Sequence, residues 1–256
     1  MGFKDLFSSG GAAYARFRPS YPAALFAWLA EVSPGRQLAI DVGTGNGQAA
    51  VALTEHFERV IGVEPGAGQL QNARAHARVE YRQAAAEDLG LPAQSAELVL
   101  AAQAFHWFAA DRFFAEAARV LRRGGLLGLV TYGNCTVNPA VDAVVAHLYA
   151  GILGPYWEPE RRLVETGYRD VVAPFGAATA PELVPPRLEL RHDLTCDEFL
   201  GYLRTWSALG RFRAETGRDA VAEIESELRA AYAAGTGAGD RAAVVWPLTV
   251  RAWRRP

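Results

Sequence analysis

The stretch that decides the fold is Ala39-Ile40-Asp41-Val42-Gly43-Thr44-Gly45-Asn46-Gly47-Gln48. Small and apolar residues surround one carboxylate, and three glycines then follow at alternate positions. The pattern predicts a buried parallel strand that runs into a turn whose backbone approaches a ligand closely. The apolar run of residues 49–53 begins a helix, so the turn joins a strand to a helix.

Strand and helix patterns alternate through the first half of the chain. Further strand-like runs cover residues 60–64, 98–102 and 126–130, with helical patterns between them. This alternation predicts βαβ units and a parallel sheet with helices on both faces. Residues 244–252 alternate as a last strand, in which Pro247 predicts a bulge or a free edge.

The bulk composition narrows the range of functions. A chain of 256 residues, half of them hydrophobic, can bury a large core, and its net charge of −2 does not favour a nucleic-acid partner. Its two cysteines, Cys135 and Cys196, match no metal or redox spacing, which predicts a reduced protein without a metal site. The sequence has no long apolar segment of the kind that spans a membrane or forms a signal peptide. We therefore expect a cytoplasmic protein.

Two carboxylates interrupt strands that should be apolar throughout. Asp41 and Glu64 lie near the carboxyl ends of their strands, where open α/β sheets bind ligands. Glu64 follows Gly47 by seventeen residues, close to the spacing of a ribose-binding acid, although a solvated turn acid before Pro65 is the alternative.

The charge near the glycines indicates which ligand binds. A dinucleotide site would space its glycines as Gly-x-Gly-x-x-Gly, whereas here Gly47 comes one residue early and Asp41 precedes the turn. A carboxylate at this place suits a cationic ligand better than a pyrophosphate, and S-adenosylmethionine carries a sulfonium and an ammonium group. A nicotinamide-dependent oxidoreductase and a non-catalytic binding module are the alternatives.

Several motifs in order resemble the class I S-adenosylmethionine-dependent methyltransferases with a type 11 methyltransferase domain. Residues 41–47 resemble their first motif, residues 60–65 the second, and residues 86–89, 98–108 and 116–125 the later ones. This resemblance spans residues 38–132. The flanking stretches are similar to the subgroup of small-molecule enzymes that includes trans-aconitate methyltransferase; they are residues 14–22, 205–207 and 246–248.

The resemblance implies both a fold and an activity. The expected fold is a seven-stranded, mostly parallel, doubly wound Rossmann-like α/β sheet with an antiparallel last strand and a helical cap. We expect one domain over residues 1–256, divided into an N-terminal arm and helix (1–35), a cofactor-binding core (36–132), a cap insertion (133–181) and C-terminal strands and helices (182–256). The expected reaction is in-line methyl transfer to a small-molecule carboxylate, hydroxyl or amine, catalysed by a monomer or homodimer.

The resemblance also implies cofactor-binding residues. The three glycines would let the backbone approach the methionine portion, Asp41 would orient that portion, and Glu64 would accept hydrogen bonds from the ribose. The remaining expected cofactor contacts are Thr44, Pro65, Ala86, Glu87, Gln103, Tyr14 and Tyr21. Many relatives carry an acid where Ala85 stands, so Glu87 would replace it as the acceptor for the adenine amino group.

The expected acceptor pocket follows the fourth strand-like run. His106 is the candidate general base for an amine or phenol, unless it only packs the loop between Phe105 and Trp107. Arg16 and Arg18 would anchor an acidic substrate or lie exposed on the arm. Tyr14 and Tyr21 would form a lid or pack the arm on the body. The other expected substrate contacts are Trp107, Tyr132 and Trp157.

Overall fold

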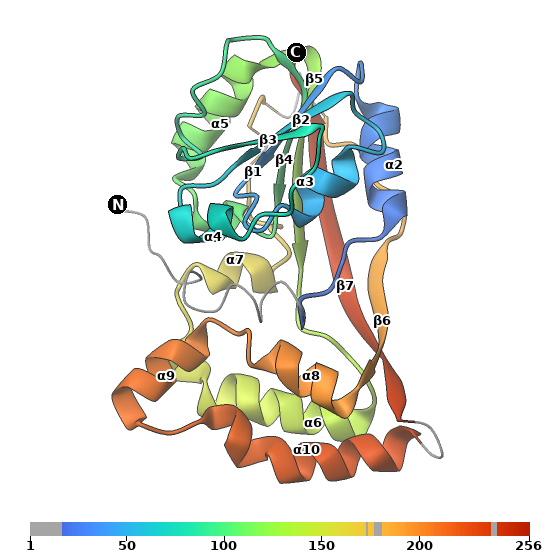
Figure 1. Ribbon diagram of the computed structural model, residues 1–256, viewed down its shortest axis with the longest axis vertical. Coiled ribbons are helices and arrows are strands. Elements are labelled where there is room, and N and C mark those ends of the chain that lie inside the picture. The colour runs from blue at the N-terminus through green and yellow to red at the C-terminus, as the bar shows by residue number, and fades with distance from the viewer. Residues whose placement is uncertain (1–16, 173, 177–180, 237–239) are drawn as a thin grey trace.

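The computed structural model describes residues 17–172, 174–176, 181–236 and 240–256 (Figure 1). Its strands are β1 (Leu38–Val42), β2 (Arg59–Val63), β3 (Val79–Arg82), β4 (Ala96–Ala102), β5 (Leu121–Tyr132), β6 (Glu189–Thr195) and β7 (Arg241–Arg254). Its α-helices are α2 (Ala23–Val32), α3 (Gln48–Leu53), α4 (Ala67–Gln71), α5 (Ala110–Val120), α6 (Pro139–Ala146), α7 (Arg161–Glu165), α8 (Cys196–Leu203), α9 (Ala208–Thr216) and α10 (Ala220–Thr236). Shorter helical turns are η2 (Phe105–Trp107), η3 (His147–Ile152) and η4 (Gly154–Tyr156).

The strands form one seven-stranded sheet in the order β3-β2-β1-β4-β5-β7-β6. The pairs among β1 to β5 are parallel, whereas β7 runs antiparallel to both β5 and β6. The predicted mostly parallel sheet with an antiparallel last strand is therefore confirmed. β3 escaped the sequence pattern because it is a short edge strand whose side chains are all only partly buried.

Helices cover both faces of the sheet, with α2 and α3 on one side and α5 on the other (Figure 1). Successive residues of each strand point to opposite faces. Ala39 and Leu98 pack with α2 and α3, and their neighbours Ile40 and Val99 pack on the α5 side. Burial on both faces explains why these strands are nearly continuous apolar runs.

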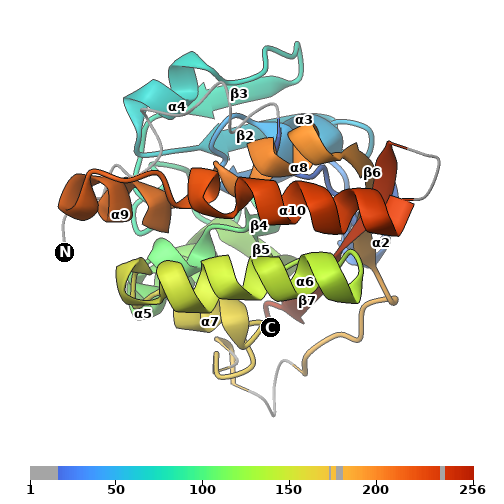
Figure 2. The ribbon, with the colours of Figure 1, turned by 90° about the horizontal axis from the view of Figure 1, so that it is seen from below.

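A layer of helices lies beyond the carboxyl ends of the parallel strands. Figure 1 shows α6, α8, α9 and α10 below the sheet, and Figure 2 shows α6 and α10 side by side across it. Val144, Phe199 and Leu228 from three of these helices share a buried cluster with Trp246 of β7. This layer is the cap, and it combines α6 of the expected insertion (133–181) with three helices of the C-terminal part (182–256). It has a hydrophobic core of its own, continuous with the long last strand.

Pro247 lies inside β7 without disturbing it. It is opposite Glu189, the first residue of β6, and the next residue, Leu248, pairs with Tyr132 at the end of β5. Proline has no backbone N–H, and Pro247 lies at the point where β7 stops pairing with β6 and begins to pair with β5. The registers on both sides are continuous and β7 is an interior strand, so the expected bulge or free edge is wrong.

Candidate active site

The glycine turn lies between β1 and α3, at the carboxyl end of the sheet. Gly43, Gly45 and Gly47 all have left-handed φ angles, of 69°, 54° and 80°. The backbone N–H groups of Gly43 and Thr44 both donate to the carbonyl of Val63 at the end of β2, over 2.8 and 3.0 Å. The turn is therefore held against the neighbouring strand rather than projecting freely.

The three glycines have different surroundings. A Cβ on Gly43 would come within 2.5 Å of the Ala104 side chain, and one on Gly47 within 1.9 Å of the Tyr81 hydroxyl. At Gly45 no heavy atom of the described residues lies within 4 Å of the Cβ position. Packing thus explains two of the glycines, while Gly45 borders open space at the tip of the turn.

Glu64 lies directly after β2 and connects two turns. It is 7% exposed, and its carboxylate accepts hydrogen bonds from the N–H of Gly45 and the N–H of Gly66, each over 3.0 Å. The buried carboxylate thus has the donors that it requires. Its proposed bonds to ribose hydroxyls would add to these, since each oxygen can accept more than one hydrogen bond.

Asp41 is a buried carboxylate beside the glycine turn. The Thr44 hydroxyl donates to it over 2.5 Å. Burial raises the pKa of Asp41 to about 6 and the charge of Glu64 adds to the increase, against the hydrogen bonds from Thr44 and the backbone of Ala50. No arginine or lysine of the described residues forms an ion pair with it. A cationic group nearby would favour its charged form.

Gln103 connects β4 to β5. Its Oε1 accepts hydrogen bonds from the backbone N–H of Tyr132 over 2.9 Å and from the Thr131 hydroxyl over 2.8 Å, while its Nε2 donates to the Tyr132 carbonyl over 3.3 Å. Its backbone is left-handed, with φ at 55°, a strained conformation for a residue other than glycine. The side chain expected to line the pocket is therefore bound to the neighbouring strand.

His106 lies in η2, immediately after β4. It is buried, and its Nδ1 is 2.9 Å from the hydroxyl of Tyr168. Burial, together with the positive charges of Arg161 and Arg18, lowers the pKa of His106 to about 3. The imidazole is therefore neutral at physiological pH, and the general-base role considered from the sequence stays a prediction. The ring of Trp107 packs against it at 4.8 Å.

Sequence reasoning missed Tyr168. The side chain is fully buried, and both Tyr168 and the preceding Gly167 have left-handed φ angles, of 58° and 59°. They follow α7, within the stretch interpreted only as a cap insertion. The signal available in the sequence was the Gly-Tyr pair after a short helical pattern, which does not identify the partner of the tyrosine.

Arg18 joins the N-terminal arm to the sheet and the cap. Its guanidinium donates to the hydroxyl of Tyr132 at the end of β5 and to the carbonyl of Thr205 after α8, each over 3.1 Å. The ring of Tyr21 packs edge-on against Tyr132 at 6.3 Å. The expected contacts Tyr14 and Arg16 lie outside the described residues.

Trp157 belongs to the aromatic core of the cap. Its indole N–H donates to the Tyr149 carbonyl over 2.9 Å, and its ring packs against Tyr149 and Trp206. The Arg161 guanidinium lies over the Trp157 ring, 5.1 Å from its centre. The charge of the same Arg161 also contributes to the lowered pKa of His106.

The residues expected near the adenine lie in loops and make contacts within the protein. Ala86 is buried, and Glu87 accepts a hydrogen bond from the backbone N–H of Ala109 over 2.7 Å. The carbonyl of Pro65 accepts from the Gln83 side chain over 3.1 Å. Gln69 of α4, which the sequence did not single out, has a buried Oε1 without a hydrogen-bond partner in the described residues. Such an atom requires a donor.

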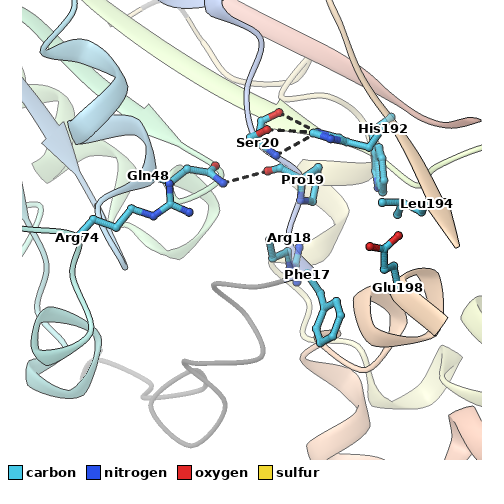
Figure 3. Close-up of a pocket in the computed structure, with 10 residues that line it drawn as sticks. Phe17, Arg18, Pro19, Ser20, Gln48, Arg74, His192, Leu194 and Glu198 are labelled. Atoms are coloured by element: carbon cyan, nitrogen blue, oxygen red, sulfur yellow. Dashed lines mark hydrogen bonds between the residues drawn. The ribbon is translucent and has the colours of Figure 1, made fainter.

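A cavity of about 340 Å³ lies between the arm and the glycine turn (Figure 3). Arg18 and Arg74 both line it, and Gln48 donates to the Pro19 carbonyl over 3.3 Å. The N–H of Arg74 also donates to the Asn46 carbonyl in the glycine turn, over 3.0 Å. The cavity therefore adjoins the turn, and its wall carries these two cations together with the Glu198 carboxylate. The sequence predicted neither Gln48 nor Arg74 as a site residue.

The described residues contain no group of three or more histidine, cysteine or acidic side chains that could hold a metal ion. In the same part of the chain, every helix is too short or too polar to cross a bilayer.

Known proteins are similar to this chain in sequence and in architecture. The family described as methyltransferase domain matches residues 40–129. A Dictyostelium discoideum protein named as a methyltransferase is 36% identical over 234 residues, which cover 90% of this chain and 87% of that protein. The solved structure of an Anaeromyxobacter dehalogenans protein described as a type II methyltransferase is 50% identical, covers 93% of this chain and 98% of its own, and has a TM-score of 0.83.

A more distant structure shows the fold alone. It is phosphoethanolamine N-methyltransferase 2 of Haemonchus contortus, solved with S-adenosylhomocysteine, at 18% identity over all of this chain and 60% of that one, with a TM-score of 0.51.

The similarity to the trans-aconitate subgroup stays a prediction. The family match and the two relatives of 36% and 50% identity show a methyltransferase, and the glycine turn with its two acids fits S-adenosylmethionine. The chain belongs to the class I S-adenosylmethionine-dependent methyltransferases.

Proposed function

We propose that this enzyme transfers the methyl group of S-adenosylmethionine to a small-molecule acceptor by in-line displacement. The observation that supports this proposal is the contact between the glycine turn and the segment after β4. A Cβ on Gly43 would touch both Ala104 and Phe108, which flank η2 and His106. Cofactor and acceptor pockets built on these two segments would adjoin each other, as a direct transfer requires.

The residues around the turn fit S-adenosylmethionine. The open space at Gly45 admits a ligand close to the backbone, and the buried Asp41 carboxylate favours a cation. Glu64 would accept from the ribose. Arg18 and Arg74 in the wall of the adjoining cavity supply positive charge for the carboxylate of the methionine portion. When bound, the cofactor supplies a methyl group activated by the sulfonium.

Adenine recognition is the part of this site that departs from the expected pattern of acidic residues. Ala85 offers no acceptor for the exocyclic amino group, and Glu87 is already bonded to Ala109. We propose the buried Oε1 of Gln69 as a further candidate acceptor, because α4 follows directly on the Glu64 turn and that atom has no partner in the described residues.

The methyl acceptor would bind beside the segment after β4. Neutral His106, Trp107, Tyr132 and Tyr168 surround this end of the sheet, and Arg161 adds positive charge. Since the nucleophile in a displacement must approach the methyl group without water between them, the aromatic side chains exclude solvent and orient the acceptor. A carboxylate would arrive ionised, whereas a hydroxyl or amine would bring a proton.

Calorimetry and a turnover screen test the proposal. The protein should bind S-adenosylmethionine and S-adenosylhomocysteine and not bind NADH, and S-adenosylhomocysteine should accumulate with some members of a panel of small carboxylic acids, phenols and amines. The Glu64→Ala variant, purified in parallel, controls for contaminating enzymes. Absence of cofactor binding would refute the site. Binding without turnover across the panel would instead support the non-catalytic alternative. The nicotinamide-dependent alternative is already excluded by the membership of the methyltransferase family.

A further inference from the structure

A second cavity, of about 590 Å³, lies on the α5 side of the sheet, and we call it the α5 groove. One wall is α5, which contributes Phe114 and Ala118, and the other is Leu163 of α7 with the segment that follows this helix. Figures 1 and 2 show α5 and α7 on the same side of the sheet. The described residues proposed to hold the cofactor all lie outside the lining of the groove, so it is separate from the glycine turn.

Packed aromatic side chains form the floor of the α5 groove. Phe105 of η2 is 2% exposed. Its ring stacks on Phe114, with the centres 5.2 Å apart, and packs edge-on against Tyr168 at 5.3 Å. Leu163 and Val171 pack against the same buried core. The groove is therefore lined by apolar side chains that their own packing holds in place, as in sites that bind small organic molecules.

Arg251 of β7 holds the segment after α7 in position. Its guanidinium donates to the carbonyl of Tyr168 over 2.6 Å and to the carbonyl of Val171 over 2.7 Å. The same guanidinium pairs with Glu182, and the Arg251 side chain is 14% exposed. The wall that carries Asp170 and Val171 is thus attached to the sheet before any ligand binds, which lowers the entropic cost of binding.

The charged side chains in the lining of the α5 groove are both acids. They are Asp111, in the first turn of α5, and Asp170, after α7, and both are exposed. Neither carboxylate forms a hydrogen bond or an ion pair with another residue in the part of the chain that the structure describes. Two acids favour a ligand with a positive charge over a neutral or anionic ligand of the same shape.

The size of the groove distinguishes a small molecule from a protein partner. A volume of about 590 Å³ lies within the range of pockets that hold one organic molecule, about 300–1,000 Å³. A stable protein interface requires about 800 Å² from each partner. Among the described residues, the large apolar side chains that are strongly exposed are Val172 and Val184, too few for such a surface.

We propose that the α5 groove binds a small amphipathic cation, with its apolar body on Phe105 and Phe114 and its ammonium group facing Asp111 and Asp170. This site goes beyond methyl transfer at the glycine turn and does not depend on the proposed function. Most of the affinity comes from the apolar contact, because exposed ion pairs contribute little. The two acids supply the selectivity for a cation.

Three probes of one shape test this selectivity: 4-phenylbutylammonium, 4-phenylbutan-1-ol and 4-phenylbutanoate. NMR titration of the full chain at pH 7.5 and low ionic strength measures their dissociation constants. We expect the cation to bind about three- to tenfold more tightly than the alcohol, and the carboxylate to bind most weakly. Equal affinities, tightest binding of the carboxylate, or no binding of any probe up to its solubility limit would overturn the proposal.

Variants locate the bound probe. Ala115→Trp fills the groove from an exposed position in its lining and should abolish binding of all three probes. Ala230→Trp, at an exposed position of α10, is the matched control and should leave binding unchanged. Unchanged probe affinities in Ala115→Trp would refute the site.

A second set of variants tests the two acids. The double variant Asp111→Asn/Asp170→Asn should lower the affinity for the cation to that for the alcohol and leave the affinity for the alcohol unchanged. Glu227→Gln, on the exposed face of α10, controls for the loss of net negative charge. A cation preference that survives in the double variant would contradict the proposal, and this variant decides if Ala115→Trp does not fold.

Competition separates the α5 groove from the cofactor site and from self-association. Saturating S-adenosylhomocysteine should change the affinity for 4-phenylbutylammonium by less than about twofold, because uncoupled sites do not alter each other's affinity. Displacement of the probe would place it in the cofactor site and overturn the proposal. Probe affinity that falls as protein concentration rises, with a larger mass in sedimentation, would show that a second copy covers the groove and would also overturn it. These readouts use no turnover, so their failure is distinct from failure of the proposed function.

Discussion

The backbone N–H of Gly45 donates to the carboxylate of Glu64 over 3.0 Å. This contact joins the turn after β1 to the residue that directly follows β2, the two places where the cofactor is proposed to bind. The other carboxylate oxygen accepts from Gly66. Glu64 therefore shapes the glycine turn and the beginning of α4 before any ligand binds, in addition to its proposed contact with the ribose.

Replacing Glu64 tests both roles. Glu64→Ala should weaken S-adenosylmethionine binding by about 1–3 kcal/mol, because charge-assisted hydrogen bonds are lost and the Gly45 and Gly66 donors lose their acceptor. Glu64→Gln keeps an acceptor oxygen and should lose less. Titration calorimetry measures the affinities, and thermal unfolding shows the loosened turn as a lower Tm. Wild-type affinity in Glu64→Ala would remove this residue from the site.

Cofactor affinity should depend on the ionisation of Asp41. A cationic ligand favours the carboxylate, and the pKa of Asp41 is about 6 in the free protein. As pH falls below about 6, binding must first remove a proton, so affinity should decrease by up to about tenfold per pH unit. Calorimetry from pH 7.5 to pH 5 measures this, and Asp41→Asn should lose the dependence. A pH-independent affinity would contradict it.

The Asp41 carboxyl should also make protein stability depend on pH, in the direction opposite to its effect on cofactor affinity. Because burial raises the pKa of Asp41 above its unfolded value of 3.8, the folded state binds more protons between pH 4 and pH 6 and loses stability as pH rises through this window. Asp41→Asn should therefore stabilise the protein at pH 7.5 by up to about 2–3 kcal/mol. The gain in urea-unfolding free energy should shrink at pH 5. A loss of stability at pH 7.5 would contradict the predicted cost of the charge.

Gly45 and Gly47 should respond differently to alanine. Gly47→Ala places a methyl group on the Tyr81 hydroxyl and should lower stability strongly. Gly45→Ala meets no neighbour and should cost only the left-handed backbone strain, about 1–2 kcal/mol. It should nevertheless reduce cofactor affinity. Thermal unfolding and calorimetry on both variants separate packing from ligand approach, and full cofactor affinity in Gly45→Ala would contradict the assignment.

A buried ion pair far from the glycine turn provides a stability test without a binding effect. Glu97 of β4 is fully buried, pairs with Arg122, and accepts from the Leu38 N–H over 2.7 Å. Glu97→Ala should lower the free energy of unfolding by roughly 2–4 kcal/mol. This is less than for a fully buried ion pair, because Arg122 is partly exposed to solvent. Cofactor affinity of the folded protein should be unchanged, and Arg122→Ala is the milder comparison.

The sequence predicted the sheet and the glycine turn because their causes are local. Buried strands read as apolar runs, and a left-handed turn favours glycine. Asp41 and Glu64 were visible as charges in such runs, and both lie buried at the carboxyl end of the sheet. β3 was missed because an edge strand with partly buried side chains carries no such pattern.

The surroundings of the proposed acceptor site depend on contacts between distant residues. His106 and Tyr168 are 62 positions apart, and Arg18 and Tyr132 are 114 apart. No periodicity links such pairs, so the sequence left His106 open between a base and a packing residue. Burial and two nearby guanidinium groups, which only the tertiary structure brings together, lower its pKa to about 3.

The sequence by itself therefore determined the fold and the cofactor, since both follow from short patterns along the chain. The tertiary structure decided what each side chain can do, because partners, burial and nearby charge arise only when the arm, the cap and the strand ends meet.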